Sequence, residues 1–158
     1  MNSIQILKGD ATVPQAKGVK IIAHICNNIG GWGKGFVLAI SKRWKEPEKE
    51  YRKWHRERAK NDFELGNIQI IQVDQYTYVA NIIGQKGIKT GSNGVPIRYE
   101  AVEKCLKKLA LKANELNASV HMPRIGCGLA GGKWEKIEPI IEKTLISSNI
   151  PTTIYDFG

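Results

Sequence analysis

The stretch MPRIGCGLAGG at residues 122–132 is the strongest indication of the fold in this chain. It follows a short strand-like run at residues 119–122 and leads into an amphipathic segment that begins at Trp134, so it joins a predicted strand to a predicted helix. Four glycines within seven residues let the backbone adopt positive φ and direct several N–H groups at one anion. We expect the helix from Trp134 to add the positive end of its dipole at the same place. The stretch therefore predicts a phosphate-binding loop, and the alternative is a turn that only reverses the chain.

A second glycine-rich loop, NNIGGWGKG at residues 27–35, has similar surroundings. It follows an apolar run at residues 19–25, a predicted buried strand, and precedes a predicted helix that starts with FVLAI at residues 36–40. Two such units place two loops at the carboxyl edge of one sheet, which predicts a ligand with a diphosphate. Neither loop has the Gly-Lys-Ser/Thr ending of a P-loop or the Gly-x-Gly-x-x-Gly spacing, so a nucleoside triphosphatase and a Rossmann dehydrogenase are disfavoured.

The remaining apolar patterns predict further strands and helices, and the predicted helices are interspersed among the predicted strands. With 158 residues and 42% hydrophobic content, the chain suits one domain, residues 1–158, with its own core. Asp74 and Gln75 suit a hairpin turn, and Asn117 suits the end of a helix. This order predicts an α/β fold, a three-layer α/β/α sandwich around a mixed sheet. The predicted strands are residues 4–8, 19–25, 67–73, 76–83, 119–122 and 152–157, and the predicted helices are residues 34–44, 47–60, 98–116 and 134–147.

The sequence has no apolar run near the ~20 residues that cross a bilayer, and its first residues lack the features of a signal peptide. We therefore expect an intracellular, cytoplasmic protein with no membrane partner. Three cysteines cannot all pair, and their contexts fit reduced thiols. His24, Cys26, His121 and Cys127 fall near strand ends but lack the closely spaced pairs of structural zinc sites. No metal site is predicted, and core packing is the expected role of Cys26 and His121.

The net charge of +9 raises the question of nucleic-acid binding. The densest basic segment, residues 42–60, also contains aromatic residues and several glutamates. The helical spacing of Tyr51, Trp54 and Arg58 predicts that the aromatic side chains face the core while the charges form a solvated face. Nucleic-acid binding stays an alternative that is not favoured, because a basic surface also attracts a pyrophosphate.

Three segments of the chain resemble the macrodomain family: GDA at residues 9–11, AHICN at residues 23–27 and PRIGCGL at residues 123–129. The resemblance covers essentially the whole chain in order. The chain looks most like the branch of terminal ADP-ribose glycohydrolases that remove ADP-ribose from acidic side chains. The resemblance implies a six-stranded sheet flanked by helices, with an ADP-ribose cleft across its top. We expect a monomer that uses no cofactor and whose partners are ADP-ribose and ADP-ribosylated protein.

The resemblance also implies the residues of the cleft. Asp10 would take the adenine amino group with the backbone of Ala11 beside it, and Ile22, Tyr155 and Phe157 would flank the ring. From the residues alone, an aspartate after a strand usually bonds turn amides, although a purine does need an apolar slot with a few polar groups. The implied ligand-binding residues are Asp10, Ala11, Ile22, Asn27, Asn28, Gly31, Trp32, Gly33, Lys34, Gly35, Phe36, Val37, Arg124, Ile125, Gly126, Cys127, Gly128, Leu129, Ala130, Gly131, Gly132, Tyr155 and Phe157.

The chain departs from the resembled branch at its catalytic positions. The resembled branch has a lysine nucleophile at the position that Gln85 occupies in this chain, and an acidic residue at the position of Ala130. Another branch has a water-activating aspartate at the position that Lys34 occupies in this chain. Lys86 is adjacent to Gln85, but side chains alternate along an extended chain, so we expect it to point to the opposite face.

A hydrolase is still the predicted activity, because an ester between ADP-ribose and a carboxylate has a good leaving group. Asn27, which by resemblance would hold the distal ribose hydroxyls, and Gln85 are the predicted catalytic residues. Together with the substrate's phosphate oxygens they would orient a water molecule. The predicted reaction is release of ADP-ribose from glutamate or aspartate side chains. The alternatives are a non-catalytic ADP-ribose reader, a basic nucleic-acid-binding module and a hydrolase that acts on ADP-ribosylated nucleic acid.

Overall fold

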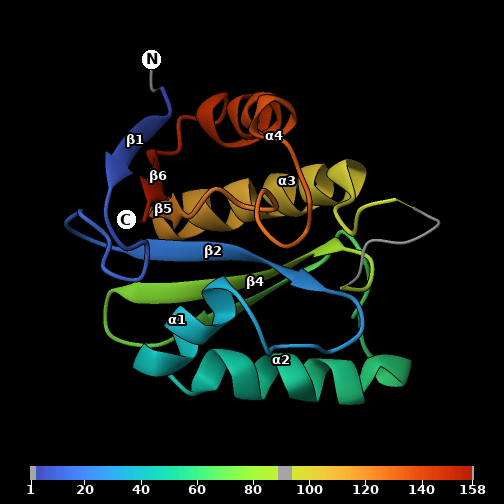
Figure 1. Ribbon diagram of the computed structural model, residues 1–158. Helices are drawn as coiled ribbons and strands as arrows, with labels where there is room; N and C mark the ends of the chain where they lie inside the picture. The colour runs from blue at the N-terminus through green and yellow to red at the C-terminus, as the bar shows by residue number, and fades with distance from the viewer. Residues whose placement is uncertain (1–2, 89–93, 158) are drawn as a thin grey trace.

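A six-stranded sheet forms the middle layer of the fold (Figure 1). The computed structural model describes residues 3–88 and 94–157. The strand order is β1-β6-β5-β2-β4-β3, in which β3 is antiparallel to β4 and all other neighbours are parallel. The strands are β1 Gln5–Lys8, β2 Lys20–Asn27, β3 Ile68–Gln72, β4 Thr77–Gln85, β5 Ser119–Met122 and β6 Thr152–Asp156. The helices are α1 Phe36–Arg43, α2 Glu46–Arg56, α3 Tyr99–Leu116 and α4 Trp134–Ile141, with the short 3-10 turn η1 Arg58–Lys60 and the π-helical turn η2 Glu142–Ile146.

Helices cover both faces of the sheet. Figure 1 shows α1 and α2 on one side and α3 and α4 on the other. Successive side chains of a strand point to opposite faces, so Ile21 packs in the core under α3 and α4 while Ile22 packs in the core under α1 and α2. The predicted three-layer α/β/α sandwich around a six-stranded mixed sheet is confirmed.

The apolar stripes of the helices explain their placement. α3 buries Val102, Leu106 and Leu109 on one stripe, as predicted, and α2 buries Tyr51 and Trp54, also as predicted. Fully burying one such leucine contributes about 1.5–3 kcal/mol relative to leaving it exposed. The spacing of apolar residues therefore decides which helix face meets the sheet.

Helix ends differ from the predicted boundaries by a few residues. α2 ends at Arg56 and η1 follows, so the helix ends earlier than predicted; Arg58, in η1, is exposed, in agreement with the predicted solvated face of charges. α4 ends at Ile141, and η2 completes the segment predicted as one helix. Asn117 ends α3 in the left-handed conformation, with φ of 52°, as its residue type predicted.

The parallel pairing brings the carboxyl ends of five strands to one edge of the sheet. The segments after β1, β2, β4, β5 and β6 all start at that edge. Both glycine-rich loops are among them, since one follows β2 and the other follows β5. Open α/β sheets bind ligands at this edge.

Two buried histidines stabilise the interior in their neutral form. His24 Nε2 lies 2.6 Å from Asn81 Oδ1, and His121 bonds Tyr155 Oη (2.8 Å) and Ser119 Oγ (2.7 Å) through its two ring nitrogens. Burial lowers the pKa of His24 to about 4, and burial with the nearby charge of Lys20 lowers the pKa of His121 to about 4. Both imidazoles are therefore uncharged in the folded protein near neutral pH.

We expect the free energy of unfolding to fall as the pH falls from 6.5 toward 4. The unfolded chain binds protons on both histidines across this range while the folded protein does not, because both folded pKa values lie below the ordinary 6.5. Each histidine contributes a slope of up to about 1.4 kcal/mol per pH unit. Urea denaturation at a series of pH values measures the slope. A His121→Asn variant should show a shallower slope, and an unchanged free energy between pH 6.5 and 4.5 would contradict the prediction.

Within residues 3–88 and 94–157, no helix is long and apolar enough to cross a membrane. Over the same residues, no group of three or more His, Cys, Asp or Glu side chains is arranged to hold a metal ion. Cys26, Cys105 and Cys127 are free thiols, the first two of them buried.

Candidate functional site

Three connected pockets form one groove along the carboxyl edge of the sheet. The first, of about 630 Å³, lies at the ends of β1 and β6 beside α1. The second, of about 300 Å³, shares Gly35, Phe36 and Pro123 with the first. The third, of about 380 Å³, shares Gln85 and Leu129 with the second. The groove therefore runs from the end of β1 to the end of β4.

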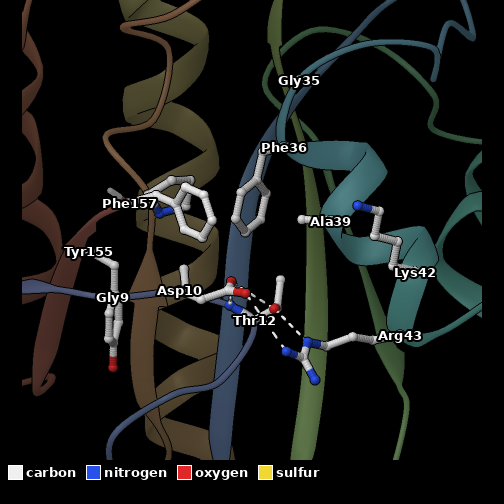
Figure 2. A pocket seen from close by; sticks show the side chains of 12 residues that line it. Gly9, Asp10, Thr12, Gly35, Phe36, Ala39, Lys42, Arg43, Tyr155 and Phe157 are labelled. Carbon is white, nitrogen blue, oxygen red and sulfur yellow. Dashed lines mark hydrogen bonds and ion pairs between the residues drawn. The ribbon is translucent and has the colours of Figure 1, made fainter.

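The first pocket contains the carboxylate of Asp10, which neighbouring side chains hold in place. Asp10 Oδ1 accepts hydrogen bonds from the backbone N–H of Thr12 (2.8 Å) and from its hydroxyl (2.7 Å). Arg43 Nε donates to Thr12 Oγ1 at 2.6 Å, and Arg43 Nη2 lies 3.7 Å from Asp10 Oδ2 (Figure 2). Burial raises the pKa of Asp10, but the Thr12 hydrogen bonds and Arg43 outweigh it and leave the pKa below its ordinary value. Asp10 is therefore an ionised hydrogen-bond acceptor.

Aromatic side chains border the first pocket. Figure 2 shows the rings of Phe36 and Phe157 on opposite sides of the space above Asp10. Tyr155 forms part of the wall and is almost fully buried; its hydroxyl accepts the N–H of Gln15 at 2.9 Å. Ile22 is fully buried among the core residues under α1 and lines none of the three pockets, so the expectation that it flanks a ring is wrong.

The second pocket combines the loop after β5 with the start of α1. Gly126 has φ of 72°, and a Cβ there would lie 2.5 Å from Ile97 Cδ1, so the loop requires glycine at this position. Gly35, with φ of 83°, caps α1. The first amides of α1 have no intrahelical partner, and Gly35, Phe36 and Val37 line the pocket. The middle of the groove therefore offers N–H groups and a helix dipole to an anion.

The helix dipole at this pocket belongs to α1 and not to α4. Lys133 N, at the start of α4, donates to Tyr99 Oη at 3.0 Å, and none of the first residues of α4 lines a pocket of the groove. The prediction that the helix from Trp134 contributes its dipole to this place is wrong. Gly131, with φ of 76°, and Gly132, whose N–H donates to Gly126 O, lie between the loop and α4.

The third pocket is built on the loop after β2, and Asn27 fixes that loop. Asn27 Oδ1 accepts from the N–H groups of Ile29 (3.0 Å) and Gly31 (2.9 Å), and Asn27 Nδ2 donates to Gly31 O at 2.9 Å. Tyr51, fully buried on α2, donates its hydroxyl to Asn27 O (2.6 Å) and Oδ1 (2.9 Å). Burial raises the pKa of Tyr51 and keeps this hydroxyl a donor. Sequence reasoning gave Asn27 a ligand-binding and a catalytic role and did not foresee this structural one.

We expect Tyr51→Phe to lower the free energy of unfolding by about 1–3 kcal/mol, because it removes the buried hydroxyl that donates to both oxygen atoms of Asn27. The loop that lines the third pocket would also lose its support from α2. Thermal and urea denaturation measure the first effect. Tyr78→Phe is the control for loss of a hydroxyl alone, because Tyr78 is half-buried on β4. Equal losses of the free energy of unfolding in the two variants would contradict the role of Tyr51.

Gln85 lies where the second and third pockets meet. It is half-buried at the end of β4, and its Nε2 donates to Gly87 O at 2.9 Å. Lys86 is exposed and lines none of the three pockets, in agreement with the predicted alternation of side chains. Arg124 borders the second pocket, but its guanidinium is held by Asp156 at 2.6 and 2.9 Å. The hydrogen bond from Asp156 raises the pKa of Arg124.

The structure brings most of the predicted ligand-binding residues to the groove. Besides Ile22, four of them line none of the three pockets: Asn28, whose Oδ1 accepts the N–H of Gly87 at 2.8 Å, and Cys127, Gly131 and Gly132. Sequence reasoning missed several residues that do line it, which are Gly9, Thr12, His24, Ile25, Cys26, Ala39, Lys42, Arg43, Ile88 and Pro123. The spacing of Ala39, Lys42 and Arg43 from Phe36 places them on one face of α1. This spacing is visible in the sequence and could have identified them as residues of the groove.

Solved structures similar to this chain share its fold over nearly the whole length. A protein of unknown function from Bacteroides thetaiotaomicron is 57% identical, with a TM-score of 0.95 over 98% of both chains. A macrodomain protein from Streptomyces coelicolor is 56% identical, with a TM-score of 0.89 over 99% of this chain and 100% of that one.

Curated relatives include proteins much longer than this chain. The chromodomain-helicase-DNA-binding protein 1-like of Danio rerio is 36% identical over 97% of this chain but only 15% of its own length, so the chain spans about one-seventh of that relative. The ADP-ribose glycohydrolase OARD1 of Bos taurus is 40% identical over 36% of this chain and 38% of its own. The model of the Macro domain matches residues 23–141, from β2 to the end of α4. With this match and the groove at the carboxyl edge of the sheet, the chain belongs to the Macro domain family.

Proposed function

We propose that this protein binds ADP-ribose in the groove and hydrolyses the ester that joins ADP-ribose to a glutamate or aspartate side chain. The observation that carries the proposal is the continuity of the groove. An acceptor carboxylate lies at one end, two glycine-rich loops and the start of α1 lie in the middle, and Gln85 lies toward the other end. This order matches the order of base, diphosphate and distal ribose in ADP-ribose.

The groove offers a suitable partner for each part of that ligand. The carboxylate of Asp10 accepts a hydrogen bond from the adenine amino group, and the rings of Phe36 and Phe157 border the base (Figure 2). The diphosphate faces the N–H groups at the start of α1 and the loop that contains Gly128. A preformed pocket of this kind fits micromolar affinity, about −8 kcal/mol. The distal ribose then lies beside Gln85.

The residues near the distal ribose favour an ester as the bond that is cleaved. Among the described residues that line the second and third pockets, the charged ones are Lys34 and Arg124, and none is a carboxylate. A water molecule positioned by the Gln85 amide attacks the anomeric carbon, the C–O bond to the acyl oxygen breaks, and the carboxylate leaves with the electron pair while the water proton passes to solvent. A carboxylate, with an ordinary pKa near 4, leaves without a general acid. Positioning and preorganised dipoles then supply the acceleration.

Cleavage assays on defined linkages test the proposal. We expect release of ADP-ribose from proteins modified on glutamate or aspartate, and little release from serine-linked ADP-ribose, whose alkoxide is a much poorer leaving group. Calorimetry with free ADP-ribose is the parallel measurement. Binding without cleavage of any linkage would make the protein a reader. Tight oligonucleotide binding with a steep salt dependence and no response to ADP-ribose would identify a nucleic-acid-binding module.

A further inference from the structure

One face of α1 carries two cations into the first pocket. Phe36, Ala39, Lys42 and Arg43 all line it, at the spacing of one helix face. Arg43 is held by Thr12 and Asp10, and its charge offsets the only carboxylate that lines the pocket among the described residues. In the described part of the chain, Lys42 forms no ion pair with a carboxylate. Figure 2 shows its ammonium apart from the Asp10–Arg43 pair. Lys42 therefore adds an unbalanced positive charge to this end of the groove.

The first pocket also has more room than a base requires. Its volume of about 630 Å³ lies in the range of sites that hold whole drug-sized ligands, 300–1,000 Å³. In the proposed orientation, the diphosphate lies at Gly35 and the base lies at Asp10, so the adenosine ribose lies between them beside α1. Lys42 is seven residues after Gly35, about 10 Å along the helix axis, and its long side chain can extend back toward the ribose hydroxyls.

We propose that Lys42 makes this end of the groove a site for a phosphate ester on the adenosine ribose. The preferred ligand would then be 2′-phospho-ADP-ribose, the ADP-ribose unit of a phosphorylated nicotinamide dinucleotide, or a group transferred from it. A dianionic monoester beside Lys42 gains an attraction that the neutral hydroxyl of ADP-ribose lacks. This inference rests on the proposed function, because it takes the orientation of ADP-ribose from it.

A different role for Lys42 makes a different prediction. A lysine in the last turn of α1 also stabilises the helix through its dipole. Were this its only role, replacing Lys42 would lower the stability of the protein and would leave the ratio of the two ligand affinities unchanged. The ratio is therefore the measurement that separates the two roles.

The test is calorimetry of ADP-ribose and 2′-phospho-ADP-ribose with the wild-type protein, Lys42→Gln and the control Lys45→Gln. Lys45 is exposed and lines none of the three pockets. At low ionic strength we expect the wild type to bind the phosphorylated ligand about five-fold more tightly, as an exposed ion pair allows, and added salt should reduce the preference. Lys42→Gln should bring the ratio close to one, and Lys45→Gln should keep it.

Two results would overturn this inference while the proposed function stands: tighter binding of ADP-ribose than of its 2′-phosphate by the wild type, or the same ratio in Lys42→Gln as in the wild type. Failure of the wild type to bind either ligand would overturn the proposed function together with the inference. Thermal unfolding of the variants shows that each is folded before its affinities are compared.

Discussion

Gly128→Glu is expected to weaken ADP-ribose binding at least about 100-fold, which corresponds to about 2.7 kcal/mol. Gly128 lines the second pocket, and a Cβ added to it has no neighbouring atom within 4 Å. Its φ is outside the left-handed region, so a side chain is accepted by the backbone. The new carboxylate would project into the space proposed for the diphosphate and repel it. Calorimetry measures the loss of affinity, and thermal unfolding should show little change.

Two variants serve as controls for this result. Gly128→Ala keeps the pocket uncharged and nearly as open, so we expect its affinity within a few-fold of the wild type. Leu111→Glu adds the same charge on the exposed face of α3, away from the groove, and should leave binding unchanged. Undiminished ADP-ribose binding by Gly128→Glu would mean that the ligand does not occupy the second pocket.

Gln85→Ala is expected to lower the turnover of ester-linked ADP-ribose about 100-fold while the affinity for ADP-ribose stays within a few-fold. The loss falls on turnover because a group that places the attacking water acts on the transition state rather than on ground-state binding. Single-turnover kinetics on a substrate modified at glutamate gives the rate, and calorimetry gives the affinity. Gln85→Asn, which keeps an amide on a shorter side chain, should recover part of the rate if the amide is what positions the water.

Lys86→Ala separates this mechanism from one that uses a lysine nucleophile. Lys86 is exposed and lines none of the three pockets, so we expect its replacement to change turnover much less than Gln85→Ala does. A collapse of turnover in Lys86→Ala, with full activity in Gln85→Ala, would assign the nucleophile to Lys86. A covalent adduct trapped by borohydride would support the same assignment, because only an amine forms a reducible imine with the opened sugar.

Regular periodicity made the fold predictable from the sequence. The strand at residues 119–122 and the helix that begins near Arg98 have the limits that their apolar patterns predict, within a residue. The two glycine-rich loops lie at the same edge of the sheet because parallel strands end there, as predicted. These features depend on local sequence and on general rules of parallel sheets, which is why no structure was needed to foresee them.

The detailed composition of the site depended on contacts that no spacing predicts. Asn27 holds its loop through hydrogen bonds to Gly31 and Tyr51, and Tyr51 is 24 residues away in the sequence. Arg43 forms an ion pair with Asp10 and donates a hydrogen bond to Thr12, although 31 residues separate Arg43 from Thr12. Both arrangements arise because α1 and α2 pack on the sheet beside the groove, which is tertiary information.

The bond between Tyr51 and Asn27 couples the ligand to the outer layer of the fold. If ADP-ribose binds only when the loop after β2 is in place, then it also binds only when α2 is docked, and ligand binding must oppose the detachment of that helix. Amide hydrogen exchange in α2 should therefore slow when ADP-ribose is added. The exchange rate in α2 would then depend on whether the groove is occupied, although α2 does not line the groove.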